Sequence, residues 1–361
     1  MENFYALIAA GGHGTRLWPM SRAKVPKQML PLIEDHSMFR TSVERISGLF
    51  APEDIFVVTG QDYAEELRGE VAHIPAANFI IEPYAKNTAP ALALALAIIE
   101  ARDPEAIVTI LTADHHIADS DKFRRVLGAA RRIAQDGRIV TLGITPTHPA
   151  TGYGYIQQGP PITEVDDFTV YQSKRFTEKP DIVRATQFLA SGQYSWNSGM
   201  FIWKVSSAMR AFEQFQPAIY AMCTYLQSAF SAPDYQQKLE GIWDTMPKLS
   251  IDVAIMEKAE NIAVIPVDIG WSDIGSWSSL YHILPQDSFG NCIKGDATDN
   301  RVILDTRDTL VYSDRLTVAI GVEDIVVVDT DDVLLICHKD RTQDVKQVVD
   351  YLKENGSEEY L

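Results

Sequence analysis

Cysteine is scarce in this sequence, and long apolar runs are absent. Only three of the 361 residues are cysteines: Cys223, Cys292 and Cys337. Their odd number and wide spacing exclude a disulfide framework and a cysteine zinc site, so we expect buried thiols in a reducing, cytoplasmic setting. No apolar stretch reaches the ~18–20 residues of a bilayer-spanning helix. Residues 1–3 lack the basic and apolar segments of an export signal, so we expect neither membrane insertion nor secretion.

Positive charge is also in short supply. The chain has 32 Lys and Arg residues against 49 Asp and Glu residues, which gives a formal net charge of −17. Because no compensating basic face is apparent, this balance argues against nucleic acid as a partner. The apolar share of 46% and the charged share of 22% are those of an ordinary globular protein. At this length we expect one large domain and a smaller one.

The positive charge that is present gathers near the N-terminus. Glu2 is the only acidic residue among the first 30, whereas several basic residues lie there: Arg16, Arg22, Lys24 and Lys27. They follow a glycine-rich loop at 11–14, which comes directly after an apolar segment at 4–10 typical of a buried parallel strand. Glycines allow close backbone approach, and unpaired N–H groups in such a loop form an anion site. The pattern predicts a binding site for a polyphosphate.

Two familiar phosphate-binding motifs do not fit this loop. No Gly-Lys-Ser/Thr closes it as in a P-loop, and Leu17 stands where the dinucleotide fingerprint needs a third small residue. A tight strand-to-helix turn with solvated cations is the structural alternative to phosphate binding.

Residues 1–145 alternate strand and helix signals, which is typical of a parallel sheet with helices on both faces and ligands at the carboxyl ends of its strands. Strands are expected at 4–10, 54–59, 79–81, 106–112 and 138–144, with helices at 88–101 and 119–134. Residues 146–285 give a mixed pattern that we interpret as an insertion into the same domain. Its strands are expected at 151–156, 175–180, 196–203 and 264–268, and its helices within 206–245.

From residue 286 onward the pattern becomes β-rich. Short strands are expected at 301–304, 310–312, 325–328 and 333–336, followed by a helix at 344–352. Their Asp, Asn and Gly turns indicate a small β-domain or rolled solenoid. We therefore predict an α/β fold with a Rossmann-like domain over 1–285 and a small β-rich domain over 286–361.

Two aspartates are candidate ligands of a metal ion. Asp114 follows the expected central strand, where an Asp can also cap a turn. A carboxylate there suits Mg²⁺, a hard ion that prefers oxygen ligands. His115 and His116 do not predict a zinc site, because no cysteine or third histidine lies at ligand spacing. Asp273, flanked by tryptophans and a glycine, is the second candidate, and Asp268 is its alternative.

The string GGHGTRLWPMSRAKVPKQ at residues 11–28 closely resembles the signature of nucleotidyltransferases that make sugar nucleotides. Its Arg-Leu-Trp-Pro and Pro-Lys-Gln spellings are similar to those of the mannose-1-phosphate guanylyltransferase branch. The resemblance covers essentially the whole chain. It implies a Rossmann-like nucleotidyltransferase domain with a mixed sheet, with a nucleotide part at 1–145 and a sugar-phosphate part at 146–285. It also implies a C-terminal domain resembling a left-handed β-helix.

The segment EPYAKNTAP at residues 82–90 is similar to the stretch that meets guanine and ribose in this family. It implies that Asn87 and Thr88 contact the nucleotide, although either could simply cap the helix that follows. The resemblance implies the following nucleotide-binding residues: Leu7, Ala9, Gly11, Gly12, Gly14, Thr15, Arg16, Asn87, Thr88 and Asp114.

Three further segments resemble the family's sugar-phosphate pocket, namely TGYG at 151–154, EKP at 178–180 and WNSG at 196–199. They imply close backbone approach at Gly152 and contact between Lys179 and the phosphate of the sugar. They also imply that Glu178 and Asn197 bond to sugar hydroxyls. Taken singly, each of these residues could belong to a turn or a strand edge.

The reaction implied by the resemblance joins mannose 1-phosphate and GTP into GDP-mannose and pyrophosphate. The sugar phosphate attacks the α-phosphorus in line, so no enzyme nucleophile is needed. Arg16 would hold the leaving phosphates, and Lys27 would neutralise the α-phosphate or the incoming phosphate. Mg²⁺ between Asp114 and Asp273 would bridge nucleotide oxygens. Two alternatives stay open: the same reaction on another hexose or heptose 1-phosphate, and a non-catalytic sugar-nucleotide sensor.

The β-rich end bears on assembly and on a second activity. Its strands at 325–328 and 333–336 have edges that need a partner or a cover, so we predict a homodimer. Some members of the family carry an additional isomerase domain of the cupin type, with metal-binding histidines. His338 is the only histidine beyond residue 290, so we expect no interconversion of fructose 6-phosphate and mannose 6-phosphate.

Overall fold

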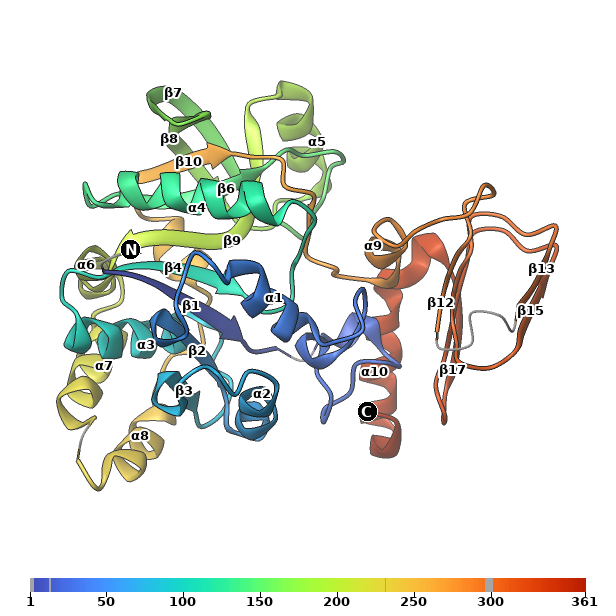
Figure 1. Ribbon diagram of the computed structural model, residues 1–361, viewed down its shortest axis with the longest axis horizontal. Helices are drawn as coiled ribbons and strands as arrows, with labels where there is room; N and C mark the ends of the chain where they lie inside the picture. Colours follow the sequence, from blue (N-terminus) through green and yellow to red (C-terminus); the bar gives the residue numbers. More distant parts are fainter. Residues whose placement is uncertain (1–2, 13, 231, 296–300) are drawn as a thin grey trace. The chain divides into compact units, whose positions relative to one another are not determined.

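Figure 1 shows the computed structural model, which describes residues 3–12, 14–230, 232–295 and 301–361. The chain forms two compact units, and each unit combines separated stretches of sequence. Unit 1 comprises Met1–Gly11, Ser42–Ala113 and Ile117–Trp271. Unit 2 comprises Gly12–Thr41, Asp114–His116 and Ser272–Leu361. Most of the glycine-rich signature therefore belongs to the same unit as the β-rich end of the chain.

Unit 1 is built on a nine-stranded mixed sheet in the order β3-β2-β1-β4-β9-β6-β10-β8-β7. β1 is parallel to β2 and β4, β2 is parallel to β3, and β9 is antiparallel to β4 and β6. The carboxyl ends of β1, β2, β3 and β4 therefore meet at one edge, as predicted. The strands are β1 (Phe4–Ala10), β2 (Ile55–Gly60), β3 (Phe79–Glu82), β4 (Ile107–Thr112), β6 (Ile139–Ile144), β7 (Tyr155–Val165), β8 (Phe168–Thr177), β9 (Tyr194–Lys204) and β10 (Ile262–Pro266).

Two kinds of helix cover this sheet. The Ala-, Leu- and Ile-rich helix α3 is buried on nearly every side, as its sequence predicts, and lies in one core cluster with α6 and α7. The amphipathic helix α4 buries one face, and Asp119 caps it by accepting a hydrogen bond from the Lys122 amide at 2.8 Å. The helices of unit 1 are α2 (Ala64–Glu70), α3 (Thr88–Arg102), α4 (Ser120–Ala134), α5 (Ile182–Ser191), α6 (Val205–Phe215), α7 (Pro217–Ala229) and α8 (Tyr235–Trp243), together with most of α1 (Met38–Ile46).

Two strands of unit 1 differ from the prediction. β7 begins at Tyr155, because residues 151–154 form bends before the strand. β8 extends back to Phe168, so the predicted strand at 175–180 is only its end. β7 and β8 form a long antiparallel hairpin with several register shifts. These irregularities break the period-two alternation of side chains, which hides most of the hairpin from a sequence pattern.

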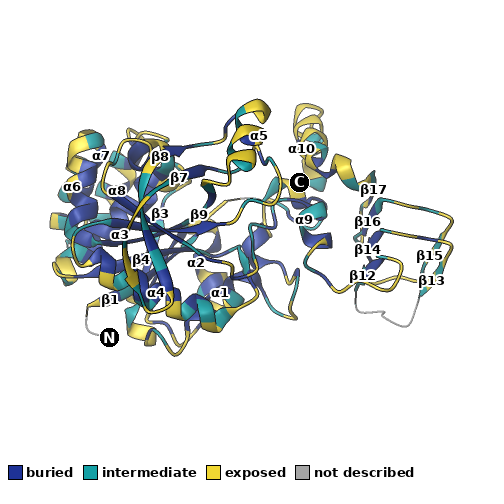
Figure 2. Ribbon diagram, turned by 90° about the horizontal axis from the view of Figure 1, so that it is seen from above, coloured by how far each residue is buried: buried dark blue, intermediate teal, exposed yellow. Residues whose placement is uncertain are grey.

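Unit 2 contains the β-rich pieces as successive turns of a solenoid. β12 (Cys292–Lys294), β14 (Leu310–Tyr312) and β16 (Ile325–Asp329) pair in parallel in one sheet. β13 (Arg301–Leu304) and β15 (Thr317–Ile320) pair in parallel in another. Successive strands therefore alternate between two sheets, which confirms the predicted β-helix-like architecture. In Figure 2, β14 and β16 are more buried than β13 and β15.

The free-edge prediction for residues 325–328 is wrong. β16 lies between β14 and β17 (Leu334–His338), and β17 is antiparallel to it. The predicted terminal helix is present as α10 (Val345–Glu354), whereas β12 and β15 had no counterpart in the sequence prediction. Both contain fewer large apolar residues than β13 and β14, so they stand out less from the turns around them.

The C-terminal part of unit 2 packs around the segment that follows the glycines. Leu17, Trp18 and Leu30 share a buried cluster with side chains of α9 (Trp277–Tyr281) and α10. The Trp18 indole donates a hydrogen bond of 2.7 Å to the Tyr360 carbonyl, and the Trp18 carbonyl in turn accepts one of 3.0 Å from the Trp277 indole. The signature segment is thus fixed by residues more than 250 positions away in the sequence.

The three cysteines are free thiols, and two of them are buried as expected. The buried thiols are Cys223 and Cys292, whereas Cys337 is half-buried. Among the residues that the structure describes, no helix has both the length and the apolar character needed to cross a membrane.

Candidate active site

The glycine-rich turn leaves β1 with backbone angles that suit glycine. Gly12 and Gly14 have φ of 102° and 60°, and His13 between them lies outside the described residues. A Cβ on Gly14 would lie 2.4 Å from the Cβ of Lys27, so no side chain fits there. Thr15–Leu17 then forms one short helical turn in which Arg16 is exposed. The turn therefore places an accessible guanidinium beside two conformationally special glycines.

Lys27 connects both predicted metal-binding aspartates. It is only 6% exposed, and its ammonium donates a hydrogen bond of 2.8 Å to Asp114 Oδ2. The same ammonium donates to the main-chain carbonyl of Asp273. Burial alone would raise the pKa of Asp114, but the charges of Lys27 and His115 outweigh it and lower the pKa below its ordinary value. Asp114 is therefore ionised at neutral pH.

Asp273 lies in a turn that its own side chain stabilises. Its Oδ1 accepts a hydrogen bond of 3.0 Å from the Gly275 amide, and a Cβ on Gly275 would lie 2.6 Å from Oδ2. The alternative residue, Asp268, belongs to unit 1 and accepts a hydrogen bond from the Gly270 amide. It is therefore Asp273 that shares a contact with Lys27. The two carboxylates offer the hard oxygen donors that suit Mg²⁺, although no group of three or more metal-ligating side chains occurs within the described ranges.

The predicted nucleotide residues Asn87 and Thr88 begin α3 in unit 1. Asn87, with φ of 72°, caps the helix by accepting a hydrogen bond of 2.8 Å from the Thr88 amide. The Thr88 hydroxyl accepts a hydrogen bond of 2.8 Å from the Ile251 amide. Both residues are exposed. The capping alternative is therefore realised, and contact with a nucleotide stays a prediction.

Leu7, Ala9 and Gly11 lie on β1 or directly after it. Leu7 is fully buried, and β1 pairs with neighbours on both sides, so the ladder occupies its main chain. Ala9 lies opposite Thr112 of β4. Gly11 is the first exposed residue after the strand.

Glu82 is a candidate functional residue that the sequence reasoning did not single out. It ends β3, is only 6% exposed, and its Oε2 has no hydrogen-bond partner among the described residues. A Cβ on Gly11 would lie 3.9 Å from its Oε1. Burial raises the pKa of Glu82 to about 7. The sequence signal that could have identified Glu82 is its position as an acidic residue at the carboxyl end of a buried strand.

The predicted sugar residues Glu178 and Asn197 lie close to each other beside Gly154. A Cβ on Gly154 would lie 2.7 Å from Glu178 Oε2 and 3.2 Å from Asn197 Cβ. At Gly152 a Cβ would have open space, and the close approach of its backbone to a sugar phosphate stays a prediction. Lys179 is exposed, has φ of 42°, and its ammonium lies 2.8 Å from Glu178 Oε1. Gly154, whose missing side chain leaves room for these two residues, and Asp252, which accepts a hydrogen bond from Asn197, were not singled out from the sequence.

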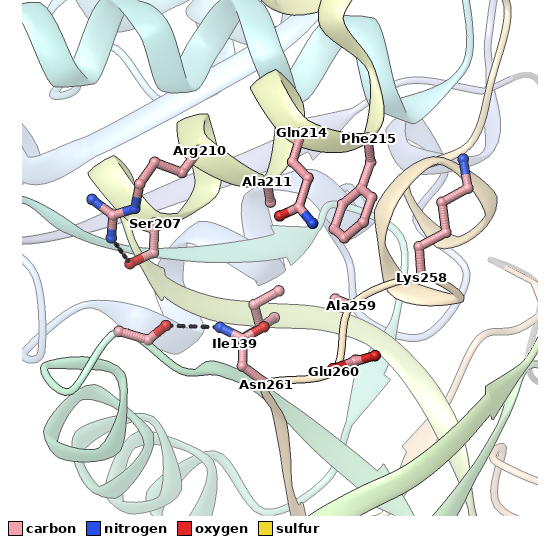
Figure 3. A pocket seen from close by; sticks show the side chains of 11 residues that line it. Ile139, Ser207, Arg210, Ala211, Gln214, Phe215, Lys258, Ala259, Glu260 and Asn261 are labelled. Carbon is pink, nitrogen blue, oxygen red and sulfur yellow. Dashed lines mark hydrogen bonds between the residues drawn. The ribbon is translucent and has the colours of Figure 1, made fainter.

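A separate pocket of about 460 Å³ lies in unit 1 beside α6 (Figure 3). Ser207, Arg210 and Gln214 of that helix line it together with Ile139 and Asn261, which stand at the beginnings of β6 and β10. Ile139 pairs with Ile262, so this is the edge of the sheet opposite the carboxyl ends. Its described lining includes none of the predicted site residues.

Comparison with known families and proteins gives consistent results. A family described as nucleotidyl transferase matches residues 5–288. A second, described as a MannoseP isomerase/GMP-like beta-helix domain, matches residues 299–352.

Similar proteins carry related names. Mannose-1-phosphate guanylyltransferase of Escherichia coli is 39% identical over 360 residues, which cover 98% of this chain and 75% of that protein. Xanthan biosynthesis protein XanB of Xanthomonas campestris pv. campestris is 39% identical over 369 residues, covering 99% and 75%. A crystal structure described as mannose-1-phosphate geranyltransferase from Thermus thermophilus is 33% identical, with a TM-score of 0.86 over 97% of this chain and 99% of the other.

Proposed function

Because this chain belongs to the nucleotidyl transferase family, we propose that it transfers GMP from GTP to mannose 1-phosphate and releases pyrophosphate. The observation that carries the proposal is the identity of 39% over 98% of the chain with an enzyme named mannose-1-phosphate guanylyltransferase. The Lys27–Asp114 ion pair next to the glycine-rich turn supports it, because this reaction needs fixed charge around phosphates.

In this reaction an oxygen of the sugar phosphate forms a bond to the α-phosphorus of GTP, and the bond to the β-phosphate oxygen breaks. Catalysis is then mainly positioning and charge neutralisation. An ammonium has three donors, and Lys27 uses two of them on Asp114 and Asp273. We assign the third to a phosphate oxygen of the reacting group. The exposed guanidinium of Arg16 would hold the leaving phosphates.

The cation of the reaction is also a proposal. Asp114 and Asp273 are the residues that would hold Mg²⁺, since both carry carboxylates and both contact Lys27. When bound, the ion supplies positive charge against the phosphates of the two substrates. Lys27 lowers the pKa of Asp114 and so favours the ionised form that would bind the ion.

Unit 1 supplies the proposed base and sugar recognition. Guanine presents adjacent N–H donors on one edge, and the buried Oε2 of Glu82, unpartnered among the described residues, is a matching acceptor at the carboxyl end of β3. Asn87 and Thr88 would contact the same nucleotide. Glu178 and Asn197 would bond to sugar hydroxyls, and the exposed ammonium of Lys179 would bind the phosphate of the sugar.

We also propose a homodimer, through a surface other than the predicted edge of β16. The outer face of β13 and β15 exposes a continuous apolar stripe in which Val302 lies beside Val318 and Leu304 beside Ile320. These side chains are between 41% and 61% exposed. A contiguous apolar patch on a protein of net charge −17 is typical of an association surface.

The function is tested by incubating the purified chain with GTP and a panel of hexose and heptose 1-phosphates. Pyrophosphate release and GDP-sugar formation are measured together. We expect the highest kcat/KM with mannose 1-phosphate. Tight binding of GDP-mannose without any pyrophosphate release would contradict the proposal and support the sensor alternative.

A further inference from the structure

Asp252 lies outside every motif found in the sequence, yet it contacts a proposed sugar-binding residue. It begins a short π-helical turn, Asp252–Met256, in unit 1. The Asn197 side-chain amide donates a hydrogen bond of 2.9 Å from Nδ2 to Asp252 Oδ1. The Oδ1 of Asn197 accepts a hydrogen bond of 3.1 Å from the Gly199 amide.

These two contacts fix which way the amide of Asn197 points. Rotating the amide by 180° would place its NH₂ against the Gly199 N–H and its oxygen against the carboxylate of Asp252. Both hydrogen bonds would be replaced by repulsive contacts between like groups. With the observed orientation, one N–H and one oxygen lone pair of Asn197 stay available to a ligand.

The surroundings of Asp252 are those of the proposed sugar site. Glu178 Oε2 and Asn197 Cβ both lie within 3.2 Å of the place where Gly154 has no side chain. The charged groups that act on Asp252 are Glu178 and Lys179, which directly follow β8. The cluster thus combines carboxylates, an amide and an ammonium around the space left by one glycine.

The backbone before Asp252 is anchored to the beginning of α3. The Ile251 amide donates to the Thr88 hydroxyl at 2.8 Å. The Leu249 carbonyl accepts a hydrogen bond of 3.0 Å from the Ala89 amide. Asp252 is therefore carried by a segment whose position is set by the helix that bears the proposed nucleotide residues.

We propose that Asp252 is a positioning residue of the sugar-phosphate site, which orients the side-chain amide of Asn197 toward a sugar hydroxyl. This inference rests on the proposed function, since it assigns a role within the same site. Asp252 acts through Asn197, so its loss weakens recognition of the sugar phosphate and leaves GTP recognition nearly unchanged.

The charge of Asp252 gives the role a pH signature. Burial and the neighbouring charge of Glu178 raise the pKa of Asp252 to about 6. At pH 8 the carboxylate of Asp252 accepts from Asn197 with nearly full charge, at pH 6 it is about half neutralised, and at pH 5 most of it is protonated. Sugar-phosphate recognition by the native chain should therefore weaken as the pH falls through 6, beyond any change that arises from the substrate's own phosphate.

The experiment compares the native chain with Asp252→Ala, Asp252→Asn, Asn197→Ala and the double variant Asn197→Ala/Asp252→Ala. KM for mannose 1-phosphate and KM for GTP are measured from pH 5 to 8. Asp166→Asn is a matched control, because Asp166 is an exposed turn residue with φ of 53° that pairs with Arg132, and Asn tolerates that conformation.

We expect Asp252→Ala to raise KM for mannose 1-phosphate about 10-fold, the scale of one lost hydrogen bond to a charged group, with KM for GTP changed less than about twofold. Asp252→Asn should recover most of this loss at pH 8. The ratio of its KM to that of the native chain should fall toward unity at pH 5, because the titration of the substrate cancels in the ratio. The double variant should be no worse than Asn197→Ala alone.

Two results would overturn the inference while the native chain stays active. One is a KM for mannose 1-phosphate in both Asp252 variants within twofold of that of the Asp166→Asn control. The other is full additivity of the Asn197 and Asp252 effects, which would show independent roles. If Asp252→Ala fails to fold, the ratio of the Asp252→Asn KM to the native KM carries the test, and a ratio that is the same at pH 8 and pH 5 would overturn the inference. A native chain without turnover would instead overturn the proposed function.

Discussion

At the scale of single residues, Lys27 contacts two aspartates that lie 159 positions apart in the sequence. Its buried ammonium binds the carboxylate of Asp114 across 87 positions and the main chain of Asp273 across 246. Two bare carboxylates near one another would repel and raise each other's pKa. The ammonium removes this penalty for Asp114, and a bound cation would do so for both.

The first prediction follows from this shared contact. Asp114→Ala and Asp273→Ala should each lower kcat by at least about 10²-fold, the scale of losing one electrostatic stabiliser of the transition state. The double variant should be scarcely worse than either single one, because both residues act on the same charge. Steady-state kinetics with Mg²⁺ added, and again with excess EDTA, provide the measurement.

Asp268→Ala is the matched control for these variants, because Asp268 was the alternative candidate and contacts the Gly270 turn. Its turnover should stay within a few-fold of the native value. Turnover that survives EDTA, or near-normal activity in both Asp114→Ala and Asp273→Ala, would refute the shared metal site.

The second prediction concerns Glu82 and the pH dependence of stability. Its pKa rises from 4.5 to about 7 on folding because of burial. The folded state therefore binds the proton of Glu82 more tightly than the unfolded state does. Protonated Glu82 thus contributes to the free energy of unfolding below pH 4.5, and this contribution is lost as the pH rises to 7. Gln at this position does not ionise, so the variant does not lose stability as the pH rises. Glu82→Gln should match the native chain at pH 4.5 and be more stable at pH 8 by about 2–3 kcal/mol.

Denaturant unfolding of both chains at pH 4.5 and pH 8 measures this difference. Glu65→Gln serves as control, because Glu65 has a side-chain exposure of 88% and pairs with Arg68 of the same helix. An equal stability change at both pH values would assign the effect to packing and not to ionisation.

At the scale of elements, regular apolar strands could be predicted from sequence, and the irregular hairpin of β7 and β8 and the weakly apolar strands β12 and β15 could not. β1, β4 and β6 match their expected ranges to within one residue because each is an apolar run or nearly so. β15 has the same length as the predicted β13 but fewer large apolar side chains. Asp252 was missed for a different reason, since it contacts Asn197 across 55 positions and no local spacing in the sequence indicates that contact.

The geometry of the glycine-rich turn is sensitive to substitution at Gly14. Gly14→Ala would place a methyl group 2.4 Å from Lys27 Cβ at a φ of 60°. Since that clash displaces Lys27, we expect kcat/KM for GTP to fall about 10²-fold, the scale of a misplacement of about 1 Å. Nucleotide titration and turnover assays check this.

Gly48→Ala separates the clash from backbone strain. Gly48 has φ of 87°, but a Cβ there has open space. It should lower the free energy of unfolding by about 1 kcal/mol and leave kcat/KM for GTP unchanged. Equal losses of activity in both variants would show that the clash with Lys27 is not the cause.

At the scale of the whole molecule, the proposed dimer has a direct test. Leu304→Asp and Val318→Asp place charges on the apolar stripe of β13 and β15. We expect light scattering at micromolar concentration to give twice the mass of one chain for the native protein and the mass of one chain for both variants. Tyr351→Asp, at an exposed position of α10, should keep the native mass. A native chain that is monomeric under these conditions would contradict the dimer.

The attachment of the signature segment to the end of the chain has a consequence for synthesis. Leu17, Trp18 and Leu30 are translated long before their buried neighbours in α9 and α10. Until those helices have been made, these apolar side chains lack part of their native cluster, and Lys27 lacks Asp273. The segment that follows the glycines therefore gains its native contacts only after α9 and α10 have been translated, and in the meantime its apolar side chains are available to chaperones that cover exposed apolar segments.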